Sequence, residues 1–135
     1  MATRTSDPFH TTALGRAIAA YLPADRQRRL LARARLERRT SATIADRAAL
    51  VAELARVAKQ GYAIETEETD VGVICIGAAV FSGDEVAGAI SVSVPTARAQ
   101  PAARRQLLQL VQKTAQAISA ALTKSAKAAT RSRPR

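Results

Sequence analysis

The clearest pattern of apolar and polar positions lies between residues 73 and 94. Residues 73–81 form an apolar run of strand length, residues 82–84 read Ser-Gly-Asp, and residues 86–94 form a second apolar run that Pro95 closes. Serine, glycine and aspartate favour tight turns, so two such runs on either side of them predict a β-hairpin.

Alternation along this hairpin separates two faces, because successive strand side chains point to opposite sides. One face carries branched residues, and the other carries small or weakly polar ones, among them Cys75, Ser91 and Ser93. A three-residue loop would pair Phe81 with Glu85 and Cys75 with Ser91, so that like faces coincide, whereas a two-residue loop would mix them. Burial favours the first register. The small face then either leaves room for a ligand or lets a helix pack closely.

The first part of the chain predicts two short helices. Leu14 and Ile18 begin an apolar stripe at helical spacing, which Thr11 or Thr12 can cap through its hydroxyl. Pro23 ends this helix and suits the first turn of a second one, which we expect to reach about residue 36. Residues 40–44 have no helical period, and we expect them to form an extended connector.

Further helices flank the hairpin. Asp46 and Gly61 are good residues to begin and end a third helix, whose apolar side carries Leu50, Leu54 and Val57. Residues 62–68 alternate as a half-buried strand does, and a last helix with a broad apolar stripe is predicted from residue 101 to about 122.

This order of elements predicts an α+β layer fold, with an antiparallel sheet packed against helices and a long C-terminal helix. We expect residues 1–8 to be a disordered lead-in, residues 9–123 to form one domain, and residues 124–135 to be a disordered basic tail. The tail is rich in Lys, Arg, Ala and Ser and has no large apolar residue.

Composition limits the kinds of site the chain can hold. Aromatic residues are only 3% of the 135 residues, which disfavours a site built on aromatic stacking. The net charge is +10, and the excess is concentrated in residues 26–39 and in the last twelve residues. We interpret it as a solvated helix face plus a tail, and the alternative, contact with nucleic acid or a membrane surface, stays open.

Catalytic and metal chemistry are disfavoured. Cys75 is the single cysteine, which excludes an intrachain disulfide and fits a reducing cytoplasm. A dyad of Cys75 and His10 is conceivable, but no pattern orients the histidine. Glu67 and Glu68 are adjacent, so on a strand they would point to opposite faces. We therefore expect no enzyme activity, no cofactor and no metal site. We also expect no signal peptide and no membrane span.

Five segments, in order, resemble the C-terminal effector domain of IclR-type transcriptional regulators. Residues 8–17, Pro-Phe-His-Thr-Thr-Ala-Leu-Gly-Arg-Ala, resemble its Pro-Leu-His-x-Thr-Ala-Leu-Gly-Lys-Ala segment. The other four are residues 40–46, residues 54–57 with 61–68, residues 72–81 and residues 89–95. Two departures are Glu65, where an aspartate is common, and Arg16, which replaces the usual lysine.

The resemblance implies a GAF-like fold that is truncated at its N-terminal side, lacking the helix-turn-helix and the first strands of the effector domain. It implies an oligomeric, cytoplasmic protein that senses a small metabolite, an organic acid or an aromatic compound, and that does not read DNA sequence by itself. The implied effector-binding residues are Ala13, Leu14, Gly15, Glu65, Cys75, Ser91 and Ser93. The alternative is an interaction fragment that pairs with a full-length regulator and binds no ligand.

Overall fold

The computed structural model describes residues 8–133. Its helices are α1 (Ala13–Ala19), α2 (Ala24–Arg33), α3 (Arg47–Gln60) and α4 (Pro101–Arg131), with a short 3-10 helix η1 (Thr96–Arg98). The strands are β1 (Ala63–Thr66), β2 (Val73–Ser82) and β3 (Glu85–Pro95), which form an antiparallel sheet in the order β1-β2-β3.

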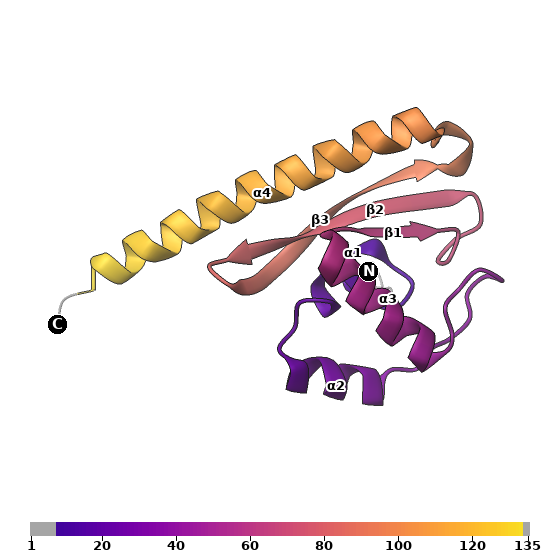
Figure 1. The fold of residues 1–135 in the computed structure, drawn as a ribbon, viewed down its shortest axis with the longest axis horizontal. Helices are drawn as coiled ribbons and strands as arrows, with labels where there is room; N and C mark the ends of the chain where they lie inside the picture. Colours follow the sequence, from indigo (N-terminus) through magenta and orange to yellow (C-terminus); the bar gives the residue numbers. More distant parts are fainter. Residues whose placement is uncertain (1–7, 134–135) are drawn as a thin grey trace, which may run out of the picture.

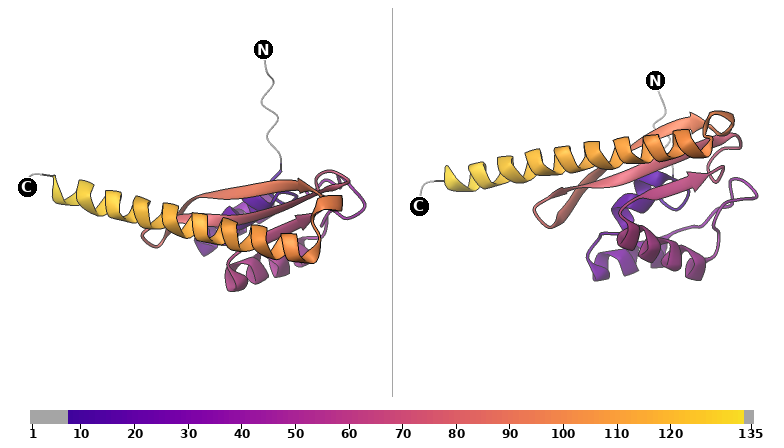
Figure 2. Two further views of the ribbon diagram at one scale, coloured as in Figure 1. Left: turned by 90° about the horizontal axis from the view of Figure 1, so that it is seen from above. Right: turned by 45° about the horizontal axis from the view of Figure 1, so that its top comes forward.

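The sheet lies between two helical layers (Figures 1 and 2). Helix α4 covers the branched face, where Ile76 and Ala78 of β2 pack with Val111 and Ala115. Helices α1 and α3 lie on the other side, and α2 packs beneath them through leucine side chains. This arrangement confirms the predicted α+β fold with its hairpin and long C-terminal helix. No helix in residues 8–133 is long and apolar enough to cross a membrane.

The register of the hairpin differs from the prediction. The turn has two residues, and Ser82 pairs with Glu85 across it. A bulge follows, because Phe81 pairs with Val86 while Val80 pairs with Gly88. The expected pairing of Cys75 with Ser91 was therefore wrong: Ser93 lies opposite Cys75, and Ser91 lies opposite Gly77. A two-residue turn alone would place the small side chains of β2 opposite the branched side chains of β3. The bulge adds one residue to β3, so beyond it small residues again pair with small ones and branched residues with branched ones.

The predicted ends of two helices are confirmed. The Thr12 hydroxyl accepts a hydrogen bond from the backbone N–H of Gly15 at 3.0 Å and caps α1. Asp46 caps α3 by accepting from the N–H of Ala49 at 2.8 Å. Gly61 ends α3 in the left-handed conformation, with φ 87°, which favours glycine.

Helix α1 buries a different face from the predicted one. Its buried residues are Ala13, Arg16, Ala17 and Ala19, whereas Leu14 is 41% exposed. The cause is the small face of the sheet, because a Cβ atom at Gly77 would lie only 3.1 Å from the Ala13 carbonyl carbon. Small residues on both surfaces allow this close approach, so the small face does receive a helix, at Gly77.

Helix α4 is longer than expected. We expected a disordered tail from residue 124, but the helix continues to Arg131 and runs past the end of the sheet (Figure 2). Alanine and lysine have high helix propensity, so the segment needs no apolar partner to be helical. Helix α2, in contrast, ends at Arg33, before the expected residue 36. Residues 40–44 form turns and bends rather than an extended connector.

Candidate functional site

A pocket of about 190 Å³ opens beside the small face of the sheet, at the N-terminal end of α1. We call it the small-face pocket, and its lining consists of Thr12, Ala13, Leu14, Glu65, Thr69, Asp70, Val73, Cys75, Ser91 and Ser93. Six of the seven residues predicted for an effector site belong to this lining. The seventh, Gly15, lies within α1 but does not line the pocket.

The thiol and hydroxyl groups of the sheet meet in this pocket. Cys75 Sγ lies 3.1 Å from Ser93 Oγ, within hydrogen-bonding distance. Burial raises the pKa of the Cys75 thiol, and the hydrogen bond with Ser93 opposes the rise. The negative charge of Glu65, a hydrogen bond that the protonated thiol can donate to Glu65, and the negative charge of Asp70 add to the rise in pKa. Cys75 is therefore a neutral thiol at neutral pH, able to donate or accept a weak hydrogen bond.

Glu65 is the only fully buried carboxylate of the pocket lining. Its Oε1 accepts hydrogen bonds from the backbone N–H groups of Glu68 and Thr69, each at 2.8 Å. Its Oε2 is buried and has no hydrogen-bond partner in residues 8–133. A buried acceptor without a partner is costly, so this oxygen favours a ligand that donates a hydrogen bond to it.

A buried ion pair joins two of the segments that form the pocket. The Arg16 guanidinium, 1% exposed, donates Nη1 to Glu68 Oε2 at 2.9 Å and Nη2 to Glu68 Oε1. Its Nε donates to the His10 carbonyl at 2.8 Å, and Glu53 Oε1 lies 3.8 Å from Nη1. Helix α1 is thus tied to the loop between β1 and β2, which also carries Thr69 of the pocket wall.

Further hydrogen bonds hold the β1–β2 loop in place. The Thr69 hydroxyl donates to the Thr11 carbonyl at 2.7 Å, and the Thr43 hydroxyl donates to the Glu68 carbonyl at 2.6 Å. Glu67 has a positive φ of 55°, and its carboxylate accepts from the N–H of Gly72 at 2.7 Å. These bonds hold the wall opposite α1 in one conformation.

His10 is not part of the small-face pocket. Its Nε2 is 2.9 Å from the Glu37 carbonyl oxygen, and the residue lines a separate hollow beside Leu30 and Arg33. The structure gives no support to a Cys75–His10 dyad. In residues 8–133 no group of three His, Cys, Asp or Glu side chains is placed to hold a metal ion.

Sequence reasoning missed four lining residues, Thr12, Thr69, Asp70 and Val73. Val73 shares the face of Cys75 by alternation and could have been found that way. Thr69 and Asp70 lie in a loop whose path depends on the Arg16–Glu68 pair, which no local pattern predicts. The complete lining holds two carboxylates, Glu65 and Asp70, and no lysine or arginine.

Comparison with known proteins places this geometry in a family. Residues 5–120 match the family model "Bacterial transcriptional regulator IclR C-terminal". The transcriptional regulator XynR of Escherichia coli is 34% identical over 116 residues, which are 85% of this chain and 46% of XynR. The regulator BhcR of Paracoccus denitrificans is 40% identical over 95 residues, 70% of this chain and 34% of BhcR. The chain therefore spans between a third and a half of the length of these relatives.

Solved structures agree with the sequence comparison. The C-terminal domain of KdgR from Escherichia coli has a TM-score of 0.79 and 31% identity, over 87% of this chain and 72% of that one. A double mutant of the inducer-binding domain of PobR from Acinetobacter, solved with 3-hydroxybenzoic acid, has a TM-score of 0.77 and 29% identity, over 83% of this chain and 67% of that one. These four relatives are regulators of transcription rather than enzymes. This chain belongs to the IclR family, and it corresponds to most of the family's C-terminal domain.

Proposed function

We propose that this chain is the effector-binding and self-association part of an IclR-type transcriptional regulator, and that a small metabolite binds in the small-face pocket. The observation that carries the proposal is Glu65 Oε2, a buried acceptor without a partner beside a thiol and two hydroxyls. The PobR domain, which has a similar fold, was solved with 3-hydroxybenzoic acid, a compound with a hydroxyl group.

The volume of the pocket limits the size of the ligand. An apolar cavity of about 150 Å³ holds benzene, so about 190 Å³ suits a compound with one ring or a few carbon atoms. Larger ligands would have to project through the open side at Ser93, which is exposed.

The electrostatics of the lining limit the ligand's chemistry. Glu65 and Asp70 repel an anion, and no lysine or arginine of the lining offsets them. A ligand hydroxyl that donates to Glu65 Oε2 would satisfy the unpartnered oxygen. A carboxyl or carbonyl group of the same ligand would accept from the hydroxyls of Ser91 and Ser93. We therefore propose a small hydroxylated compound, aliphatic or aromatic, with or without a carboxyl group.

The test is a thermal-shift screen with matched pairs, in which one compound carries a hydroxyl and the other lacks it. Neutral pairs such as 3-hydroxybenzamide against benzamide are compared with anionic pairs such as 3-hydroxybenzoate against benzoate. A ligand present at 100 times its Kd stabilises the fold by about 2.7 kcal/mol, which is readily measured. The hydroxylated member of a pair should raise Tm more than its partner.

Calorimetry with variants then locates the site. Replacing Ser91 and Ser93 by alanine should weaken binding by about 1–3 kcal/mol, because buried hydrogen bonds to the ligand are lost. Ser125→Ala, an exposed serine on α4, is the matched control and should leave affinity unchanged. Unchanged affinity in the double variant would place the ligand elsewhere. A chain that binds no compound in the screen would favour the interaction fragment over the sensor.

Self-association belongs to the same proposal. Strand β3 is at the edge of the sheet in the described residues, and positions 86–95 carry no charged side chain. A long uncharged edge exposes backbone donors and acceptors that can pair with another strand. We therefore propose that two copies associate through this edge, next to the open side of the small-face pocket.

A further inference from the structure

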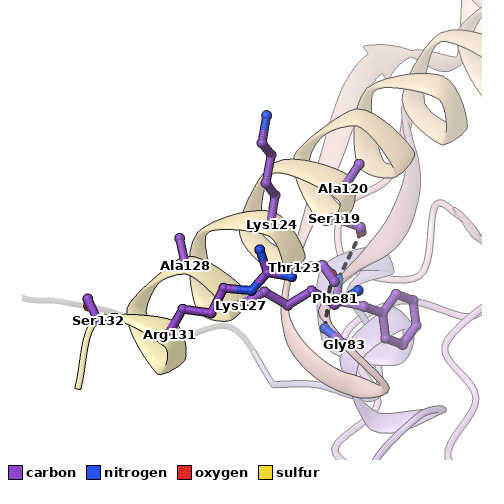
Figure 3. Close-up of a pocket in the computed structure, with 10 residues that line it drawn as sticks. All are labelled: Phe81, Gly83, Ser119, Ala120, Thr123, Lys124, Lys127, Ala128, Arg131 and Ser132. Carbon is purple, nitrogen blue, oxygen red and sulfur yellow. Dashed lines mark hydrogen bonds between the residues drawn. The ribbon is translucent and has the colours of Figure 1, made fainter. Parts of the chain in front are cut away.

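A second hollow lies at the other end of β2 from the small-face pocket. It has a volume of about 770 Å³ and lies between the tip of the hairpin and the C-terminal half of α4 (Figure 3). We call it the α4 groove, and its lining consists of Phe81, Gly83, Ser119, Ala120, Thr123, Lys124, Lys127, Ala128, Arg131 and Ser132.

Two side-chain bonds hold the hairpin tip against α4 and so shape the groove. The Ser119 hydroxyl accepts from the N–H of Phe81 at 2.9 Å, and the Thr123 hydroxyl accepts from the N–H of Gly83 at 3.0 Å (Figure 3). Beyond Thr123 the helix extends without the sheet beneath it. The groove is therefore open along the last two turns of α4, on the side that faces the hairpin tip.

The groove is lined by positive charges and by no carboxylate. Lys124, Lys127 and Arg131 line it, and all three side chains are exposed and form no salt bridge within residues 8–133. No aspartate or glutamate occurs from residue 86 to residue 135. The acidic residues nearest in sequence to the groove's hairpin part, Asp84 and Glu85, are not in the lining. Such a surface attracts anions.

The spacing of the three cations indicates which anion fits. At 1.5 Å of rise per residue, Lys127 lies about 4.5 Å and Arg131 about 10.5 Å along the helix axis from Lys124. Successive phosphates of one strand of duplex DNA are about 3.4 Å apart along the duplex axis, so a helix lying along that axis would bring the three cations past about three phosphates. A single free phosphate would meet only one or two of the cations.

Other occupants fit less well. Phe81, the only aromatic residue of the lining, is in edge-to-face contact with Tyr21, with ring centroids 5.0 Å apart, so it offers no free face for stacking unpaired bases. Helix α4 of a second copy is also a poor occupant, because it has no acidic residue that could face the cations of the groove. The net charge of +10 on each copy adds repulsion. We propose that the α4 groove binds the phosphate backbone of duplex nucleic acid without reading its sequence.

The proposal is independent of the small-face pocket and is tested on the full chain. Fluorescence anisotropy with a labelled duplex of about 20 base pairs gives the Kd between about 50 and 200 mM salt. Three phosphate contacts predict a slope of log affinity against log salt of about −2.7, hence a loss of about 40-fold over this range. Two unrelated duplex sequences should give the same Kd.

A matched pair of variants locates the contact. The groove variant is Lys124→Gln/Lys127→Gln/Arg131→Gln. The control is Arg26→Gln/Arg29→Gln/Arg33→Gln, which removes three exposed charges with the same spacing from helix α2. Glutamine keeps the helix propensity of lysine and arginine, and circular dichroism checks the helix content. The groove variant should lose at least tenfold in affinity at 50 mM salt and flatten the salt dependence, while the control changes affinity by less than threefold.

Each other outcome contradicts the proposal. An equal loss in both variants would mean that net charge alone drives binding. Tighter binding to vesicles containing phosphatidylserine, or to polyglutamate, than to the duplex would assign the groove to a membrane or to an acidic protein. Absence of any duplex binding at 50 mM salt, or a Kd that depends strongly on sequence, would overturn it as well.

Discussion

Arg16 of helix α1 and Glu68 of the β1–β2 loop form a two-pronged ion pair that is almost completely buried, with side-chain exposures of 1% and 10%. The residues are 52 positions apart in the chain. Because Ala13 lies one turn before Arg16 and Thr69 directly follows Glu68, the pair connects the two walls of the small-face pocket. Its integrity should therefore control both stability and the shape of the pocket.

Replacing Glu68 by glutamine should destabilise the protein by about 3–5 kcal/mol, because Arg16 is left buried with incomplete charge compensation from the more distant Glu53. Arg16→Lys should cost less, since an ammonium keeps one ion pair but loses the two-pronged geometry. Urea unfolding measures both changes. Equal stability of the wild type and Glu68→Gln would show that the pair contributes nothing to the fold. Glu85→Gln, an exposed glutamate at the start of β3, is the control, because it leaves this ion pair intact.

Gly15→Ala should destabilise the protein by about 1–3 kcal/mol, although alanine is the better helix former. A Cβ atom there would lie 2.6 Å from the backbone oxygen of Phe9, which cannot move without displacing the loop before α1. Gly88→Ala on β3 is the matched control, since its Cβ would have only ordinary contact with Val80, at 3.9 Å. Thermal unfolding compares the two. A stabilised Gly15→Ala would show that the loop before α1 yields to the added methyl group and would contradict the expected clash.

The Cys75 thiol should react slowly with iodoacetamide at neutral pH, because burial raises its pKa and the thiolate is the reactive form. Ser93→Ala removes the hydrogen bond that lowers the pKa, so the midpoint of the rate–pH curve should move to higher pH. Improved solvent access to the thiol would act in the opposite direction and move the midpoint to lower pH, because burial is the main cause of the raised pKa. A midpoint that moves to lower pH in Ser93→Ala would contradict the proposed effect of the Ser93 hydrogen bond on the Cys75 pKa.

The raised pKa of Cys75 also makes the free energy of unfolding depend on pH. The folded state holds the Cys75 proton more tightly than the unfolded state, so it binds more protons between the two pKa values. The contribution of the protonated Cys75 thiol to the free energy of unfolding is therefore fully present below the unfolded pKa of about 8.5. It is lost as pH rises through the raised pKa of the folded state. Cys75→Ala should reduce the loss of stability on the alkaline side, measured by urea unfolding against pH.

Local sequence patterns predicted the faces of the sheet but not its register. Alternation along β2 and β3 placed Cys75, Ser91 and Ser93 on one face, because that parity is set by strand geometry. The pairing partner of Cys75 depends on whether a bulge follows the turn, and neither the apolar pattern nor the turn residues at 82–84 specify a bulge. The error was two positions, and for that reason it left the composition of the site almost unchanged.

The burial of α1 could not be predicted in the same way. The pattern favoured Leu14 as a core residue and gave no sign that Arg16 is buried, whereas the structure exposes the first and buries the second. An arginine becomes a core residue only where carboxylates and a carbonyl from distant segments converge on it, in this chain Glu68, Glu53 and His10. Resemblance to a family, rather than helical spacing, indicated this segment as part of a site.

The uncharged edge of β3 should be the contact through which copies of the chain associate. We expect a dimer or larger species by light scattering, because the edge from residue 86 to residue 95 has no charge to keep another strand away. Val94→Lys places a charge on this edge in every copy, so that association must either separate the charges or bury one of them. Val51→Lys on α3, where the valine is 49% exposed, makes the same substitution on another layer of the fold. Val94→Lys should shift the mass toward the monomer between about 10 and 200 µM, and Val51→Lys should not. A wild-type chain that stays monomeric over this range would rule out the edge as a contact. Dissociation by Val51→Lys alone would assign association to the surface of α3, and equal dissociation of both variants would show that the edge has no special role.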